Sequence, residues 1–202
     1  GKAFFIAKRD EQIARHAKHN NTEYNLEPDL KNAPGGLRDI QTIGWVAKRH
    51  FGADTLRDLV SHGFITEAEF MELDECQCVI WRIRFALFVV SGRSDTRILF
   101  DYQRRMAELF GYGDSQANHG VERLMQDYYR AAMRISMLNE MLLRYFDEAI
   151  LGEDESAPVV ELNSRFQLRN GVIEVASEDV FRRYPSALLE IFVLLGDHPE
   201  VT

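Results

Sequence analysis

The sequence predicts a mainly α-helical protein, an elongated helical bundle that carries a small β-hairpin near its C-terminus. Two observations lead to this fold class. Apolar residues recur three and four positions apart through most of residues 1–151, which is the spacing of one helix face. Beyond residue 165 the period changes, and two short apolar segments flank Asn170-Gly171, a dipeptide suited to a tight hairpin. We therefore expect a bundle domain at 1–151, a linker or loop at 152–164, and at 165–202 the hairpin with C-terminal helices packing on the bundle.

The first fifty residues read as two helices joined by a long loop. Helical spacing extends from Ala3 to about His19. The segment from Thr22 to Gly36 contains prolines and glycines and has no sustained period, so it is a loop. Loops of this length are unusual in compact domains unless they are functional or packed. A second helix should start after Gly36 and run to about His50.

Four further helical elements are expected before residue 152. The first is a short element from Asp54 to Ser61. A long helix should begin at the capping box of Thr66 and Glu69 and end before Gly92, and a shorter one should lie near residues 101–110. The last is the most regular, and its heptad spacing predicts a bundle helix rather than an autonomous coiled-coil dimer. Its seam comprises Val121, Leu124, Tyr128, Ala131, Ile135, Leu138, Leu142, Tyr145 and Ala149.

The C-terminal part begins where the composition changes at Gly152. The residues that follow are acidic, poor in apolar side chains and interrupted by Pro158, which is typical of a linker or exposed loop. After the hairpin, helical runs are expected from Glu178 to Tyr184 and from Pro185 to Leu195.

Composition and charge exclude several classes of protein. Hydrophobic residues make up 46% and charged residues 28%, as in ordinary globular proteins, and no apolar stretch has the length of a membrane helix. The formal net charge of −8 argues against a nucleic-acid partner. The chain shows no secretory signal, and we expect a cytoplasmic context without a membrane. Cys76 and Cys78 are expected to be two buried, reduced thiols rather than a disulfide or a zinc site.

One segment carries candidate binding residues. Residues 1–50 contain nine Lys/Arg against six Asp/Glu, so if an anion binds anywhere in the chain, this is the segment where we expect it. Glycines allow close backbone approach, and a helix start presents N–H groups with partial positive charge. The candidate nucleotide-binding residues are Lys31, Gly35, Gly36, Arg38 and Asp39. The alternative interpretation is a plain Pro-Gly-Gly turn, with Asp39 as a first-turn carboxylate and Arg38 as its solvated neighbour.

The same segment resembles the bacterial PII uridylyltransferase family. The resemblance covers essentially the whole chain and also includes Arg165-Phe166-Gln167-Leu168 and Tyr184-Pro185 near the other end. Asp29 stands where many relatives are expected to have Asn. The N-terminal motifs that carry the resemblance are Phe4-Phe5, Arg15-His16, Tyr24-Asn25-Leu26-Glu27-Pro28 and Pro34-Gly35-Gly36-Leu37-Arg38-Asp39.

The resemblance implies a place inside a longer enzyme. A nucleotidyltransferase domain would precede this helical region, and a hydrolase domain of the HD type followed by ACT domains would come after it. The parent would use Mg²⁺ and UTP to transfer UMP to a tyrosine of the PII signalling protein, and would remove it by hydrolysis. In this reading the chain helps to wall the nucleotide cleft, and its partners are PII and the two neighbouring domains.

Neither active centre is expected in this chain. It contains no Asp-x-Asp pair to hold Mg²⁺ for transfer, and none of its six histidines is followed by Asp, as the hydrolase centre requires. We therefore predict no catalytic and no metal-binding residue, and a fragment inactive by itself. His16 and His19 could share a metal, although a solvated helix face explains them better. Two alternatives stay open: the helical region of glutamine-synthetase adenylyltransferase, and a non-catalytic interaction scaffold.

Overall fold

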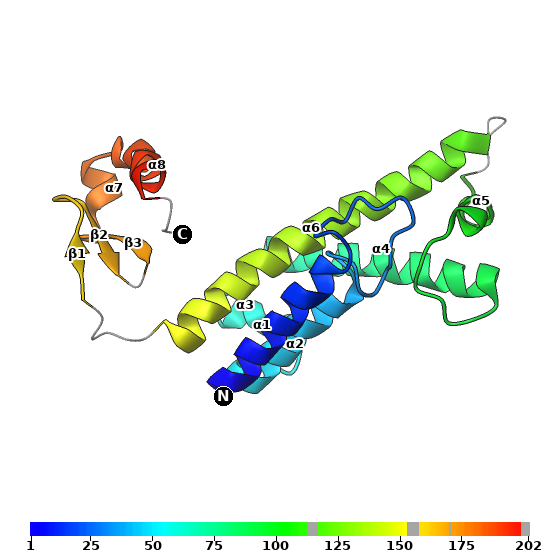
Figure 1. The fold of residues 1–202 in the computed structure, drawn as a ribbon, viewed down its shortest axis with the longest axis horizontal. Helices are drawn as coiled ribbons and strands as arrows, with labels where there is room; N and C mark the ends of the chain where they lie inside the picture. Colours follow the sequence, from blue (N-terminus) through cyan, green and yellow to red (C-terminus); the bar gives the residue numbers. More distant parts are fainter. Residues whose placement is uncertain (113–116, 153–157, 170, 199–202) are drawn as a thin grey trace. The chain divides into compact units, whose positions relative to one another are not determined.

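The computed structural model describes residues 1–112, 117–152, 158–169 and 171–198, and the chain divides into two compact units. The first unit comprises Gly1–Leu151 and the second Gly152–Thr202. In the residues that the structure describes, the regular elements of the first unit are helices and loops join them, whereas the second unit combines a small sheet with two helices (Figure 1). The prediction of a mainly α fold with a small antiparallel β element near the C-terminus is confirmed.

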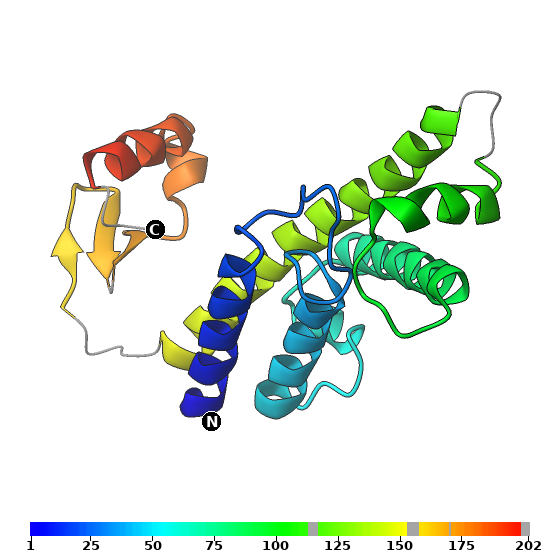
Figure 2. The same cartoon turned by 45° about the vertical axis from the view of Figure 1, so that its right-hand side comes forward.

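The helices of the first unit are organised around its last helix, which packs against most of the others. In Figures 1 and 2 this helix, α6, runs the length of the unit, while α1 and α2 lie toward one end and α5 toward the other. The helices that the structure describes in this unit are α1 (Lys2–Ala17), α2 (Leu37–Phe51), α3 (Asp58–Ser61), α4 (Glu67–Ser91), α5 (Phe100–Leu109) and α6 (Ala117–Leu151).

Local chemistry sets the helix ends close to where the sequence predicts them. The capping box at the start of α4 is present, because the Thr66 side chain accepts from the Glu69 N–H while the Glu69 carboxylate accepts from the Thr66 N–H. Gly92 ends α4 in the left-handed conformation, with φ of 68°. The chain leaves α1 through Asn20 and Asn21, whose positive φ values of 60° and 50° suit asparagine better than most residues.

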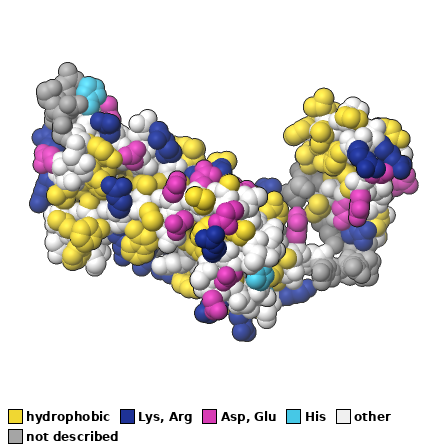
Figure 3. Space-filling view, turned by 180° about the vertical axis from the view of Figure 1, so that it is seen from behind, with side chains coloured by type: hydrophobic (Ala, Val, Ile, Leu, Met, Phe, Trp, Pro, Cys, Tyr) yellow, Lys and Arg dark blue, Asp and Glu magenta, His cyan; other side chains and the backbone are white. Residues whose placement is uncertain are grey.

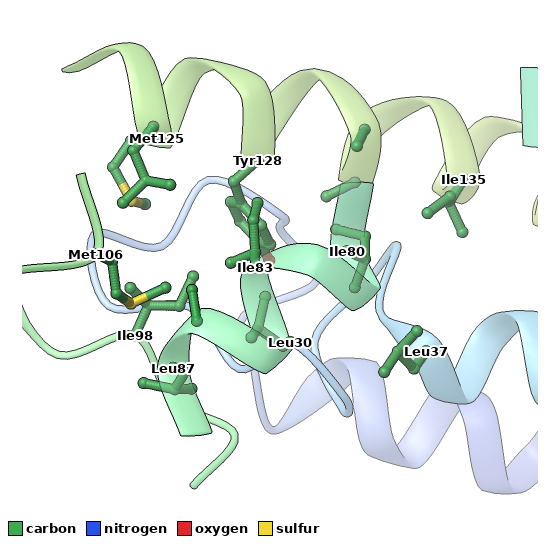
Figure 4. Packing of buried hydrophobic residues seen from close by; sticks show 14 of the residues in the cluster. Leu30, Leu37, Ile80, Ile83, Leu87, Ile98, Met106, Met125, Tyr128 and Ile135 are labelled. Carbon is green, nitrogen blue, oxygen red and sulfur yellow. The ribbon is translucent and has the colours of Figure 1, made fainter. Parts of the chain in front are cut away.

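The larger core of this unit lies between α4, α5 and α6 and is closed by the loop before α2. In Figure 4, Tyr128 points from α6 toward Ile83 on α4, and Leu30 from the loop belongs to the same cluster. The tyrosine is completely buried, and this burial raises its pKa. The loop from Thr22 to Gly36 is therefore part of the packed structure and not a surface tether, because Leu30 and Ala33 are completely buried.

A second core lies between α1, α2, α3 and the end of α6. It is rich in aromatic rings: the Phe146 ring lies 5.3 Å from that of Phe51 and 5.1 Å from that of Phe64, measured between ring centroids. Phe5 brings α1 into the same cluster and is fully buried. The two cores explain how α6 can be apolar over most of its length.

The predicted seam of α6 is right over most of its length and wrong at its end. Leu124, Tyr128 and Leu142 are buried as predicted, whereas Tyr145 is 43% exposed and Phe146 is completely buried. A straight helix has 3.6 residues per turn, so its buried stripe drifts by about 20° per heptad relative to a 3.5-residue repeat. After several heptads the residue that faces the core is the next one along the chain.

The second unit contains one strand that the sequence does not reveal. The strands β1 (Val160–Glu161), β2 (Phe166–Arg169) and β3 (Val172–Val175) form an antiparallel sheet in that order. β1 lies inside the range expected to be linker, because two exposed residues carry no recognisable period. In the predicted hairpin turn, Gly171 has φ of 79°, and Asn170 lies outside the described residues. Residues 153–157 of the predicted linker also lie outside them.

Two helices cover this sheet through a small core. α7 (Val180–Arg183) is shorter than predicted, and α8 (Ala187–Asp197) continues through Gly196 rather than ending before it. Phe166, Val180 and Ala187 form the buried cluster.

The two cysteines of the first unit differ in exposure. Cys76 is half-buried and Cys78 is exposed, and both are free thiols, so the expectation of two buried thiols is wrong for Cys78. Burial raises the pKa of the Cys76 thiol, and the nearby Glu72 carboxylate adds to the effect. Among the described helices, none combines the length and the apolar character that crossing a membrane requires.

Candidate functional site

The loop that contains the sequence motif is held in shape by Asp29. Its carboxylate accepts hydrogen bonds from the backbone N–H groups of Lys31 and Asn32, both at 2.8 Å, and from the Thr96 hydroxyl at 3.1 Å. Burial is the largest influence on the pKa of Asp29 and raises it, but the hydrogen bonds from Asn32 and Lys31 outweigh burial and leave the pKa below its usual value. The loop therefore relies on an ionised Asp29.

The loop is also tied to the segment between α4 and α5. The Leu30 N–H donates to the Thr96 carbonyl at 2.7 Å, and the Ile98 N–H donates to the Pro28 carbonyl at 2.9 Å, so that Asp29 and Arg97 form an isolated antiparallel bridge. These bonds satisfy backbone groups that a buried loop would otherwise leave unpaired. The loop is thus packed against distant parts of the chain.

Asp39 is the centre of a buried polar cluster at the start of α2. Its carboxylate is completely buried and accepts from Arg15 Nη2 at 2.8 Å, from His16 Nε2 at 2.9 Å and from the Gly35 N–H at 2.8 Å. A second nitrogen of Arg15, Nη1, donates to the Asn32 carbonyl at 3.0 Å. The cluster fastens α1, the loop and α2 to one another.

The two glycines allow the loop to lie against its neighbours. Gly35 has φ of 72°, and a Cβ atom there would lie 2.0 Å from the Ala132 carbonyl oxygen on α6. A Cβ atom on Gly36 would lie 2.8 Å from the Ala33 carbonyl oxygen and 2.9 Å from that of Lys31. Only a residue without Cβ fits at either position.

The backbone N–H groups at this helix start are already used inside the protein. The N–H groups of Gly36, Leu37 and Arg38 donate to the carbonyls of Ala33, Leu30 and Lys31 at 2.9–3.0 Å. The expectation that the helix start offers free N–H groups is therefore wrong. An anion near the start of α2 could therefore be bound only by side chains and not by these backbone N–H groups.

Two of the five predicted binding residues have side chains that reach solvent. Lys31 and Arg38 are partly exposed, whereas Gly35, Gly36 and Asp39 are buried. The Arg38 guanidinium lies 5.4 Å from the ring centroid of Trp45, which is 37% exposed. Lys8 Nζ, from α1, lies 4.7 Å from the same centroid. We name this group of Lys8, Lys31, Arg38 and Trp45 the cationic corner.

Sequence reasoning missed several residues of this region. Arg15 and His16 belong to the motif, but the sequence does not show that both contact Asp39. The only local signal is that Gln12 and Arg15 lie on the helix face that also carries Phe5, which is buried. In the described part of the chain no three His, Cys, Asp or Glu residues are grouped so that they could hold a metal ion.

Comparisons with known proteins agree with this motif. The family model described as GlnD PII-uridylyltransferase matches residues 3–143, and one described as uridylyltransferase GlnD third domain matches residues 166–202. No solved structure gave a significant match.

Three similar curated proteins carry the description bifunctional uridylyltransferase/uridylyl-removing enzyme. Those of Stutzerimonas stutzeri strain A1501 and Pseudomonas aeruginosa strain LESB58 are each 54% identical over 200 residues, and that of Azotobacter vinelandii strain DJ is 52% identical. In each case the match covers 99% of this chain and 22% of the relative. The sequence thus spans about a fifth of the length of these relatives, and because the first family model matches well over half of it, the chain belongs to the GlnD PII-uridylyltransferase family.

Proposed function

We propose that this chain is the helical region of a bifunctional enzyme that transfers UMP from UTP to the PII protein and removes it again. In this proposal the cationic corner faces the nucleotide cleft, which the preceding nucleotidyltransferase domain completes. The observation that carries the proposal is the pair of partly exposed cations, Lys31 and Arg38, beside the rigid Gly35-Gly36 turn in a chain of this family.

The five candidate residues would then have two different tasks. Lys31 and Arg38 would contact the phosphate groups, since a guanidinium can donate two parallel hydrogen bonds to one phosphate. Gly35, Gly36 and Asp39 would hold the turn in place, because they are buried, the Gly35 N–H donates to Asp39, and both glycines pack closely against neighbouring backbone. Because of this division, substitution of Arg38 is the most direct test of the proposal.

Mg²⁺ would be held elsewhere in the parent protein. The described residues offer no group of carboxylates that suits it, so these residues do not fit the ion. The hydrolase domain, the PII protein and a cytoplasmic location are likewise parts of the proposal that concern the complete enzyme.

The test compares Arg38→Ala with Arg49→Ala in the full-length enzyme. Both residues are on α2, and Arg49 is exposed in its last turn, far along the helix from the Gly-Gly turn. Removing a charged hydrogen bond costs about 1.5–3 kcal/mol, so kcat/KM for UTP should fall roughly 10- to 100-fold in Arg38→Ala and stay nearly unchanged in Arg49→Ala. Thermal unfolding of both variants should match that of the parent. Equal activity of the two variants would refute a nucleotide-facing role for Arg38.

The two alternative functions have less support. The relatives at 52–54% identity are uridylyl enzymes, and an assay with ATP in place of UTP distinguishes the adenylyl reading directly. A scaffold that binds partners through the α6 seam would need that seam exposed. Leu124, Tyr128 and Ile135 are instead buried inside the unit.

A further inference from the structure

A second surface of the first unit, far from the Gly-Gly turn in sequence, is apolar and unpartnered. Trp81, Phe85 and Val89 follow one another four residues apart on α4 and are 47%, 70% and 52% exposed. Together with Leu109 and Phe110 of α5 they line a groove of about 710 Å³. We call it the α4–α5 groove. Figure 3 shows hydrophobic side chains gathered at the end of the unit that carries α5, with Lys or Arg side chains among them.

This row is additional to the face of α4 that packs in the core. The inner face of the helix carries Ile80, Ile83 and Leu87, which are completely or almost completely buried. A helix that is apolar on both faces is typical of a position inside a larger structure, and contiguous exposed apolar surface marks an interaction site. We therefore expect a permanently bound partner to cover this outer row of side chains.

The charges around the groove indicate what that occupant carries. Residues 76–111 contain six Arg, no Lys and three Asp/Glu, in a chain whose net charge is −8. Arg82 stacks on Phe110 and Arg84 on Trp81, each at 5.4 Å from the ring centroid. Within the described residues neither of these two arginines forms an ion pair. Arginine and aromatic side chains together are the composition of binding hot spots.

We propose that the α4–α5 groove is the docking site of an acidic amphipathic helix that belongs to the parent polypeptide outside these 202 residues. A helix fits because side chains four residues apart form a ridge that packs into the groove of another helix. Acidic residues beside its apolar stripe would pair with Arg82 and Arg84. The parent is the source because permanent interfaces are the more apolar ones, and this chain makes up 22% of its relatives. The proposal does not depend on the nucleotide-facing role of Arg38.

The probe is a fluorescein-labelled designed peptide of about 20 residues, long enough to form a marginal helix, with Leu at every third or fourth position and Glu beside the stripe. A second peptide replaces every Glu with Lys. Fluorescence anisotropy should show that the 202-residue chain binds the Glu peptide at least about ten-fold more tightly than the Lys peptide, as opposite charges across an interface require. Full-length parent protein should bind the Glu peptide at least about ten-fold more weakly than the chain does, because its own helix fills the groove.

The variants are Phe85→Glu and, as a matched control, Leu188→Glu on α8. Both side chains are exposed, at 70% and 55%, so neither change disturbs a core. Phe85→Glu should weaken Glu-peptide binding at least about ten-fold, as loss of a hot-spot residue does, while Leu188→Glu should leave it unchanged.

Other results would overturn the proposal. If the Lys peptide bound as tightly as the Glu peptide, an acidic occupant would be ruled out. If Leu188→Glu weakened Glu-peptide binding as much as Phe85→Glu does, binding at the α4–α5 groove would be ruled out. Full affinity in the full-length protein would assign the groove to a separate protein. Sedimentation of the chain as a dimer that Phe85→Glu converts to a monomer would assign it to a second copy.

Discussion

Replacing Asp39 with Asn should destabilise the first unit by roughly 3–5 kcal/mol, the cost of breaking a buried ion pair. The carboxylate is completely buried, and the side chain of its partner Arg15 is only 9% exposed. Asn retains an oxygen that can accept from the Gly35 N–H, but it loses the charge that Arg15 and His16 contact. Two charged hydrogen bonds at about 1.5–3 kcal/mol each sum to about 3–6 kcal/mol, which overlaps this range.

The matched control is an exposed ion pair on the same unit. Lys48 and Asp54 lie 3.3 Å apart with side chains that are 68% and 84% exposed. Asp54→Asn should therefore cost no more than about 1 kcal/mol, the usual value for a surface pair. It differs from Asp39→Asn in burial and not in the chemistry of the substitution.

Urea unfolding followed by tryptophan fluorescence measures both variants. Both tryptophans, Trp45 and Trp81, belong to the first unit, so the signal reports the unfolding of that unit alone. Asp39→Asn should lower the urea midpoint much more than Asp54→Asn while leaving the slope of the transition unchanged. Midpoints that shift equally would refute the conclusion that the Asp39 cluster holds α1 and α2 together.

Two further predictions concern the same loop. Gly35→Ala should destabilise the first unit by about 2–5 kcal/mol, since it adds left-handed strain to overlap with Ala132, whereas Gly63→Ala, whose φ of 75° is similar but whose surroundings are open, should cost only about 1–2 kcal/mol in the same urea experiment. The pKa of Asp29 is lower in the folded than in the unfolded protein, so its contribution is present above its ordinary value of 3.8 and is lost as pH falls through the folded value. Asp29→Asn should consequently lower the urea midpoint at pH 6 and lower it less at pH 3; an equal shift at both pH values would contradict this role.

The position of the candidate site in the chain could be predicted from the sequence, but the burial and the contacts of its residues could not. Its prolines and glycines between two helical patterns mark residues 22–36 as a special segment. The burial of Asp39 and of Gly35 could not be read from the sequence, because it depends on Arg15 of α1 and Ala132 of α6. The presence of Trp45 beside Arg38 was missed for a related reason, since a tryptophan seven residues along a helix reads equally well as core.

The sequence by itself determined the helices, the turn chemistry and the family. The capping box at Thr66 and the left-handed Gly92 act over four residues or fewer, so the pattern that predicts them is the interaction that forms them. The tertiary structure alone decided the strand β1, the choice of Phe146 over Tyr145 as a core residue, and the joining of Arg15, His16 and Gly35 at Asp39. These features depend on contacts between residues far apart in the chain or on drift accumulated along a long helix, which no local pattern encodes.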